Sequence, residues 1–151
     1  MTYYIPRARR IAKEAHKGQV DKAGQDYFSG HLNRVAVSVK GWEAITVAYL
    51  HDLIEDTSWT LEDLGDGLFP DHIVQAVKTL TRPEDKTYID WIRGIARYGS
   101  RLAIRVKIAD IKDHLRDTSH IPVSLVKRYR RALMILEAEL NHYQPIRKTN
   151  E

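Results

Sequence analysis

The sequence predicts an all-α fold, a single-domain helical bundle over residues 1–151. Three observations predict it. Apolar residues recur at helical spacing along most of the 151 residues. One segment, 42–54, is apolar on almost every face, which is typical of the central helix of a bundle. No run has convincing strand character, and the chain contains no internal repeat or low-complexity tract. The length suits one domain with a sizeable core.

The first third of the chain predicts two helices separated by a loop. Proline is favoured in a first helical turn and glycine after a helix end, so the first helix is expected to begin near Pro6 and end near Gly18. Residues 17–30 contain three glycines and little periodicity, which indicates a loop. A second helix is expected over about 31–40, ended by Gly41, and the apolar helix follows directly.

The rest of the chain predicts further helices with clear boundaries. The stretch "TLED", residues 60–63, has the spacing of a capping box, in which two side chains satisfy backbone N–H groups at a helix start. The polar residues 81–87 and a break around "HIPVS" (120–124) separate the later helices. These helices are expected over residues 71–80, 88–99, 101–117 and about 123–143.

The composition limits the chemistry that the chain can carry. It has no cysteine, which excludes a disulfide scaffold, a thiol nucleophile and thiolate ligation, so any metal must be bound by nitrogen and oxygen. The formal net charge of +4 and the pI of about 9.3 suit an anionic partner such as a phosphorylated small molecule or nucleic acid, although such an excess is also common without one. The N-terminus has no apolar signal core and no segment approaches membrane-spanning length, so a cytoplasmic protein without a membrane partner is expected.

The stretch "HDLIEDT" (51–57) places one imidazole and three carboxylates at the end of the apolar helix. On a continuous helix His51 and Glu55 share a face, as do Asp52 and Asp56. All four side chains then fall within an arc of roughly 140°. Carboxylates at a helix C-terminus oppose the helix dipole, and a sequence that breaks such a rule often marks a functional site. The alternative is a frayed, solvated helix end.

Two further ionisable residues lie beside apolar neighbours on other predicted helices. His31 begins the second helix, and Asp110 lies within "RVKIADIKDHL" (105–115). A single histidine is more often structural than a ligand, and a single helical aspartate is usually solvated. Three separate helices nonetheless each carry an imidazole or an acid, and a bundle can bring such side chains together in a metal site.

The segments "AHKGQVDKAGQDYFSGH", "AYLHDLIEDT" and "VKIAD" resemble the HD-domain metal-dependent phosphohydrolases, and most closely the small Rel/SpoT-type hydrolases of the alarmone guanosine tetraphosphate. The resemblance extends from about Ala8 to Leu140. It implies an all-α fold of the HD type and one divalent cation, usually Mn²⁺, although the donor types also suit Fe, Co and Zn. The implied metal ligands are His31, His51, Asp52 and Asp110. The implied catalytic acidic pair is Glu55 and Asp56.

The resemblance also implies the reaction and its substrate contacts. The family removes the 3′-pyrophosphate from its nucleotide, and substrate contacts are expected at Lys22, Tyr27, Lys107 and His114. For both lysines a solvated surface position is an equal alternative. Asp21 stands where the family has a base-holding arginine, and His114 stands where it has an asparagine near the sugar. Both departures concern substrate recognition and leave the implied metal ligands unchanged.

The sequence therefore predicts a metal-dependent phosphohydrolase of a phosphorylated nucleotide, with the 3′-pyrophosphate of guanosine tetra- or pentaphosphate as the candidate group removed. One alternative is hydrolysis of another nucleotide or phosphorylated cofactor. A second is a nucleotide-binding sensor without turnover, against which the acidic pair argues. A third is a nucleic-acid-binding bundle, since "KRYRR" (127–131) is strongly cationic. At helical spacing this stretch gives an amphipathic face instead, and no nucleic-acid-binding module is recognised, so no nucleic acid partner is expected.

Overall fold

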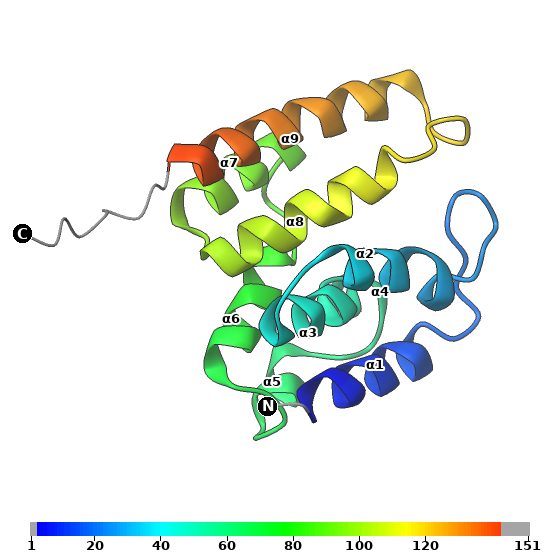
Figure 1. Ribbon diagram of the computed structural model, residues 1–151, viewed down its shortest axis with the longest axis vertical. Helices are drawn as coiled ribbons and strands as arrows, with labels where there is room; N and C mark the ends of the chain where they lie inside the picture. The colour runs from blue at the N-terminus through cyan, green and yellow to red at the C-terminus, as the bar shows by residue number, and fades with distance from the viewer. Residues whose placement is uncertain (1–2, 143–151) are drawn as a thin grey trace, which may run out of the picture.

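The computed structural model describes residues 3–142, and their regular structure is helical (Figure 1). The elements in chain order are α1 (Tyr4–Ala15), the π-helical turn η1 (Phe28–Leu32), α2 (Asn33–Ser38), α3 (Trp42–Leu50), α4 (Leu53–Asp56), α5 (Leu61–Gly65), α6 (Asp71–Leu80), α7 (Tyr88–Tyr98), α8 (Arg101–His114) and α9 (Val123–His142). The only β feature within residues 3–142 is an isolated bridge between Val20 and Asp26. The predicted all-α fold is therefore confirmed.

The helix α3 is the centre of the bundle. It packs against α1, α2, α6 and α8. Its buried residues are Ala44, Thr46, Val47, Ala48, Tyr49 and Leu50. The helix α8 lies between this group and α9, and α9 packs against both α7 and α8 (Figure 1). Because α3 and α8 are neighbours, polar side chains near their C-terminal ends can meet inside the bundle.

The predicted helix over 42–54 is interrupted at His51 and Asp52. The helix α3 ends before these two residues and the short helix α4 begins after them. Asp52 has φ −101° and ψ 1°, outside the helical region. His51 Nδ1 donates a hydrogen bond to the carbonyl oxygen of Ala48, 2.6 Å away. In a continuous helix that carbonyl accepts from the backbone N–H of Asp52, so the imidazole competes with the helix. The prediction of one continuous helix is wrong.

Helical structure begins earlier than predicted ahead of α2. The turn η1 starts at Phe28 and leads directly into α2, so His31 lies inside a helical segment and does not open it. Asp26 Oδ2 accepts hydrogen bonds from the backbone N–H and the hydroxyl of Ser29, each at 2.8 Å. This side chain caps the segment, which is why a sequence that looks like a glycine-rich loop is already helical there.

The remaining predicted helices are confirmed to within a few residues. The capping box at the start of α5 is present, because Thr60 Oγ1 accepts from the Asp63 N–H and Asp63 Oδ2 accepts from the Thr60 N–H. The helix α1 begins two residues before Pro6, and α8 ends at His114, short of the predicted 117. The predicted end of the last helix at Tyr143 lies outside the described residues. No helix within residues 3–142 is both long and apolar enough to cross a membrane.

Candidate metal centre

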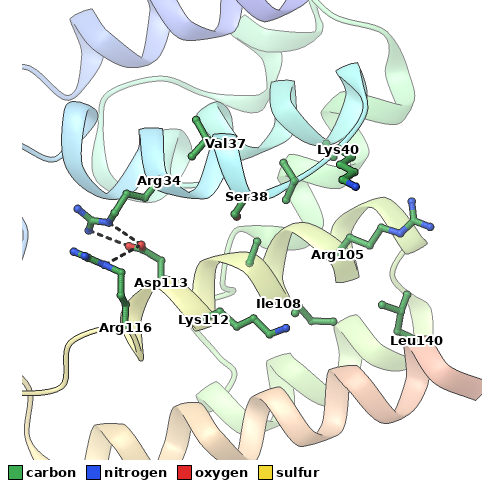
Figure 2. A pocket seen from close by; sticks show the side chains of 13 residues that line it. Arg34, Val37, Ser38, Lys40, Arg105, Ile108, Lys112, Asp113, Arg116 and Leu140 are labelled. Carbon is green, nitrogen blue, oxygen red and sulfur yellow. Dashed lines mark hydrogen bonds and ion pairs between the residues drawn. The ribbon is translucent and has the colours of Figure 1, made fainter.

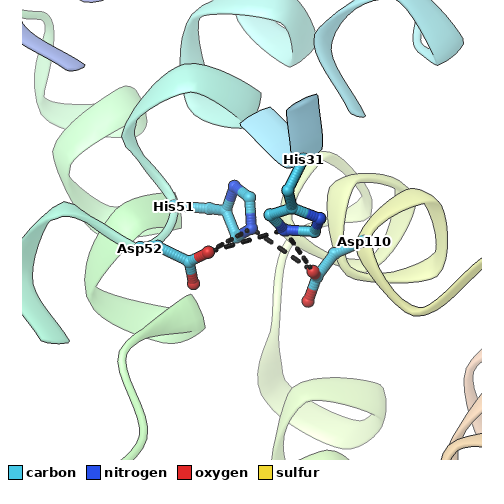
Figure 3. A group of neighbouring side chains, drawn as sticks. All are labelled: His31, His51, Asp52 and Asp110. Carbon is cyan, nitrogen blue, oxygen red and sulfur yellow. Dashed lines mark ion pairs between the residues drawn. The ribbon is translucent and has the colours of Figure 1, made fainter. Parts of the chain in front are cut away.

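Four ionisable side chains from separate parts of the chain converge where η1, α3, α4 and α8 meet (Figure 3). They are His31 in η1, His51 and Asp52 between α3 and α4, and Asp110 in α8. One donor atom from each lies within 4.8 Å of the others. His31 Nε2 is 3.1 Å from Asp110 Oδ1. His51 Nε2 is 3.1 Å from Asp52 Oδ2. The four residues named by the sequence motifs thus lie together.

Three donor atoms of this cluster lack hydrogen-bond partners. His31 Nε2, His51 Nε2 and Asp110 Oδ1 are buried, and none of them makes a hydrogen bond despite their short separations. A buried polar atom without a partner costs free energy, so a converging set of them indicates a binding site. Burial alone would lower the pKa of His51, but the carboxylates of Asp52 and Asp110 outweigh it and raise the pKa to about 10. This negative potential and the mixed nitrogen and oxygen donors both fit a divalent cation.

The other ring nitrogen of each histidine is held by a hydrogen bond. His31 Nδ1 lies 2.7 Å from Asp113 Oδ2, and His51 Nδ1 donates to a backbone carbonyl. These bonds leave each Nε2 free to act as a ligand. Arg34 donates to Asp113 from Nε at 2.7 Å and from a terminal nitrogen at 3.0 Å. Burial would raise the pKa of Asp113, but the hydrogen bonds from His31 and Arg34 outweigh it and lower the pKa to about 2.

Asp113 and Arg34 were not predicted from the sequence. Asp113 follows Asp110 by three residues on the same helix, so the two carboxylates share a face of α8. That spacing was the available signal for Asp113. Arg34 carried no comparable signal, because its partner becomes evident only when η1 and α2 pack on α8.

Tyr27 and Lys107, which were expected to contact substrate, contact two residues of the cluster. The Tyr27 hydroxyl donates to Asp52 Oδ2 at 2.5 Å. Lys107 Nζ lies 2.8 Å from Asp110 Oδ2 and 4.4 Å from the centre of the Trp91 ring. Burial alone would lower the pKa of Lys107, but the Asp110 carboxylate raises it above its usual value. Lys107 is buried, so the alternative of a solvated surface position is wrong for this residue.

The acidic pair lies on α4 and stays accessible to solvent. Glu55 and Asp56 are both exposed, and Glu55 Oε1 accepts a hydrogen bond from the backbone N–H of Arg82. Partial desolvation by the surrounding groups raises the pKa of both carboxyls, and the charge of Asp52 raises both further. Because the chain turns at 51–52, the pair is carried by its own short helix rather than by the end of α3.

His114 stacks between two rings beside the cluster. Its ring centre lies 4.7 Å from that of His31 and 5.1 Å from that of Tyr129. Its Nε2 lies 3.1 Å from Asp110 Oδ1. His114 also lines the cavity next to the cluster, so it lies between the candidate metal centre and this cavity.

A cavity of about 420 Å³ opens beside the centre, between the loop over 20–25 and the end of α8. Lys22 lines this cavity with its side chain exposed. Asp21 also lines it, but its Oδ1 accepts hydrogen bonds from the backbone N–H groups of Ala23 and Gln25, each at 2.9 Å. Its Oδ2 lies 3.7 Å from the Arg34 guanidinium. Asp21 therefore stabilises the loop that forms one wall of the cavity.

No model of a known protein family matches the chain, but individual relatives do. A probable GTP pyrophosphokinase of Mycobacterium leprae is 29% identical over 149 residues, covering 91% of this chain and 19% of the relative. The guanosine-3′,5′-bis(diphosphate) 3′-pyrophosphohydrolase of Aquifex aeolicus is 35% identical over 81 residues, covering 52% of this chain and 12% of the relative. The chain thus spans about a fifth or less of the length of these curated relatives.

A solved structure is similar over nearly the whole chain. It is described as a metazoan orthologue of SpoT that hydrolyses ppGpp, and it matches with a TM-score of 0.74 at 22% identity, covering 97% of this chain and 87% of that chain. This match confirms the all-α fold of the HD type. The sequence relatives and the shared fold together confirm the predicted resemblance to the Rel/SpoT-type hydrolases. That resemblance implies a divalent cation, and the cluster of two histidines and two aspartates could hold one.

Proposed function

We propose that this chain is a metal-dependent phosphohydrolase that removes the 3′-pyrophosphate of guanosine tetraphosphate, with residues 1–151 forming one HD-type domain. The observation that carries the proposal is the cluster of two histidines and two aspartates beside an open cavity, in which His31 Nε2, His51 Nε2 and Asp110 Oδ1 are buried without a hydrogen-bond partner. Support also comes from relatives that are named for this reaction. The proposed location of this activity is the cytoplasm, as expected from the sequence.

The proposed cation is Mn²⁺, and its proposed ligands are His31, His51, Asp52 and Asp110. When bound, the cation supplies Lewis acidity toward a phosphate oxygen and a water nucleophile. Tyr27 and Lys107 each bond a ligand carboxylate, and they orient Asp52 and Asp110 toward the centre. Asp113 does the same for His31 through its Nδ1. These contacts hold the ligands before substrate binds.

Glu55 is the proposed general base, with Asp56 as its accessible neighbour. The Arg82 N–H fixes Oε1 of Glu55, which leaves the other carboxylate oxygen to accept a proton from water. Its raised pKa makes it a better proton acceptor than a fully solvated glutamate. Lys22, exposed in the cavity wall, is the proposed contact for a substrate phosphate. His114 is the proposed donor to the sugar, because it lies between the centre and the cavity.

Hydrolysis of another nucleotide or a phosphorylated cofactor is the second candidate function. Asp21 favours this candidate, because it stands where the family has an arginine that holds the base. Its carboxylate instead accepts hydrogen bonds from its own loop and pairs with Arg34. His114, whose ring is sandwiched between two others, has a different reach from the asparagine of the family. A sensor that binds the nucleotide without turnover has less use for an accessible acidic pair.

A release assay over a nucleotide panel tests these candidates together. The purified chain is incubated with Mn²⁺ and each of guanosine tetraphosphate, GTP, ATP and phosphorylated cofactors, and the products are separated by anion-exchange chromatography. We expect guanosine tetraphosphate to yield GDP and pyrophosphate with Mn²⁺ and no product with EDTA. Turnover of a different compound in the panel would support the second candidate. Binding without any product would support the sensor.

A further inference from the structure

A second hollow, of about 700 Å³, lies apart from the loop over 20–25, none of whose residues lines it (Figure 2). It runs between α2 and α8 toward the end of α9. It shares only Arg34, Asp113 and Arg116 with the cavity beside the metal centre. Its volume is in the range of sites that bind small molecules.

The floor of this hollow is aliphatic, and part of it is open to solvent. Val37, Ala44, Ile108 and Ala109 contribute to it, and the Val37 side chain is 75% exposed, whereas Ala44 and Ile108 are buried. An exposed apolar surface inside a concavity indicates a site that can bind another molecule. A single exposed apolar residue on a convex surface is common and does not indicate such a site. The one hydroxyl in the lining, that of Ser38, already donates to the backbone carbonyl of Val35. The floor therefore offers faces for packing and almost no groups that could recognise a polar edge.

The rim of the hollow is strongly cationic. Arg34 and Arg116 stand beside Asp113 at one end, and Lys40 and Arg105 stand at the other (Figure 2). Lys112 lies between them and pairs with Glu137 at 3.3 Å. Within residues 3–142 neither Lys40 nor Arg105 makes an ion pair or a side-chain hydrogen bond, and both are exposed. The lining thus contains five cations and one carboxylate, Asp113, which Arg34 already neutralises, and Lys40 and Arg105 are left without an anionic partner among the described residues.

We propose that this hollow is a second binding site, and that it takes a purine nucleotide with its phosphates on the cationic rim and its base on the aliphatic floor. A polyphosphate matches the excess of positive charge better than a monoanion does, and guanidinium groups suit phosphate oxygens geometrically. A flat face of a purine can pack on the exposed Val37 side chain at this floor. Since the Ser38 oxygen, which can still accept, is the only side-chain hydrogen-bonding group among the described residues of the floor, the site should distinguish guanine from adenine only weakly. This inference does not depend on the proposed hydrolase activity.

The test is a titration of the ¹⁵N-labelled full chain with ADP and with GDP in EDTA, followed by two-dimensional NMR. We expect saturable shifts at the amides of Val37, Lys40 and Ile108, with dissociation constants for the two nucleotides within about threefold. Adenosine, which lacks the phosphates, should produce shifts at least about tenfold weaker in affinity. These three amides lie in the second hollow and not in the cavity beside the metal centre.

Charge reversal separates the two sites. Lys40→Glu combined with Arg105→Glu should weaken ADP binding at the Val37 amide by about tenfold or more. Both residues are exposed, and unchanged shifts elsewhere in the spectrum check that the variant is folded. Lys22→Glu, which alters the other cavity, is the matched control and should leave that affinity unchanged. The proposal would be overturned if the shifts were confined to Ala23 and His120, or if Val37 showed no saturable shift. Equal binding of ADP by the double variant and wild type would also overturn it.

Discussion

His31 Nδ1 and Asp113 Oδ2 lie 2.7 Å apart, although 82 residues separate them in the sequence. Their contact joins η1 to α8 and turns the free Nε2 of His31 toward Asp110. Arg34 completes the arrangement by holding both oxygens of Asp113. The geometry of the candidate metal centre therefore depends on residues that would not themselves touch the cation.

Asp113→Asn should weaken Mn²⁺ binding by about 10- to 100-fold, which is the usual cost of losing a carboxylate behind a metal-bound histidine. The amide can still accept from His31, but it carries no charge and loses the paired hydrogen bonds to Arg34. Titration of free Mn²⁺ by electron paramagnetic resonance measures the affinity. Glu139 is an exposed carboxylate on α9, and Glu139→Gln is the control, which should bind Mn²⁺ with the affinity of wild type. Unchanged Mn²⁺ affinity in Asp113→Asn would show that Asp113 does not position His31 for metal binding.

Glu55→Gln should retain Mn²⁺ binding and lose about 10²- to 10⁴-fold in kcat, because an amide cannot accept the proton from water. The amide oxygen can still accept from the Arg82 N–H, so the local structure is kept. Steady-state kinetics on the substrate identified by the panel give kcat, and a Mn²⁺ titration gives the affinity for the ion. Glu62→Gln on the exposed face of α5 should behave as wild type. A variant with full kcat would show that Glu55 is not the base.

Mn²⁺ should stabilise the wild-type chain and should fail to stabilise Asp110→Ala. Binding to the native state adds about 2.7 kcal/mol when the free ion is at 100 times its dissociation constant. The variant should also be less stable without metal, by about 3–5 kcal/mol, because Lys107 is left buried without its partner. Thermal and urea unfolding with Mn²⁺ and with EDTA measure both effects. An Asp110→Ala chain that gains as much stability from Mn²⁺ as wild type would contradict the proposed ligand set.

Asp21→Arg should destabilise the loop over 20–25 rather than simply restore a base-holding cation. The substitution removes hydrogen bonds to the N–H groups of Ala23 and Gln25 and brings a second cation beside Arg34. A loss of about 1–3 kcal/mol in the free energy of unfolding is expected. Asp21→Asn, which can still accept from both N–H groups, is the comparison for urea unfolding and should lose less. Equal stability of Asp21→Arg and wild type would show that these bonds contribute little.

His114→Asn restores the residue of the family at the other departure and leaves the loop untouched. Asn donates to a sugar hydroxyl from a shorter side chain, so kcat/KM for guanosine tetraphosphate should rise if this substrate is handled poorly by wild type. If wild type is already efficient and the variant is slower, His114 is an adaptation within alarmone hydrolysis. The ratio of kcat/KM between guanosine tetraphosphate and the other panel compounds measures the effect.

Helices with strong apolar periodicity could be predicted from the sequence, as could the capping box at Thr60 and Asp63. Local propensity and tertiary packing agree in those segments. The helical start at Phe28 and the break at His51 could not be predicted, because each depends on a side chain that competes with or replaces a backbone hydrogen bond. Such competition does not change the apolar periodicity of the sequence, so a prediction from periodicity cannot detect it.

The candidate site likewise has features that could be predicted from the sequence and features that could not. The grouping of the two histidines and two aspartates was implied by the family resemblance, and a bundle can bring such residues of separate helices together, although their binding of a metal stays a prediction. The burial of Lys107 against Asp110 and the contact between Arg34 and Asp113 could not be predicted, because a charged residue in a helix is usually solvated. Which charged residues become buried is decided by how the helices pack, not by their local sequence.

Anomalous diffraction from crystals grown with Mn²⁺, recorded on both sides of the manganese absorption edge, tests the central claim most directly. The account predicts one anomalous peak with a nitrogen of His31, a nitrogen of His51 and a carboxylate oxygen from each of Asp52 and Asp110 within about 2.0–2.3 Å of it. A peak elsewhere, or no peak at a Mn²⁺ concentration that supports turnover, would contradict it.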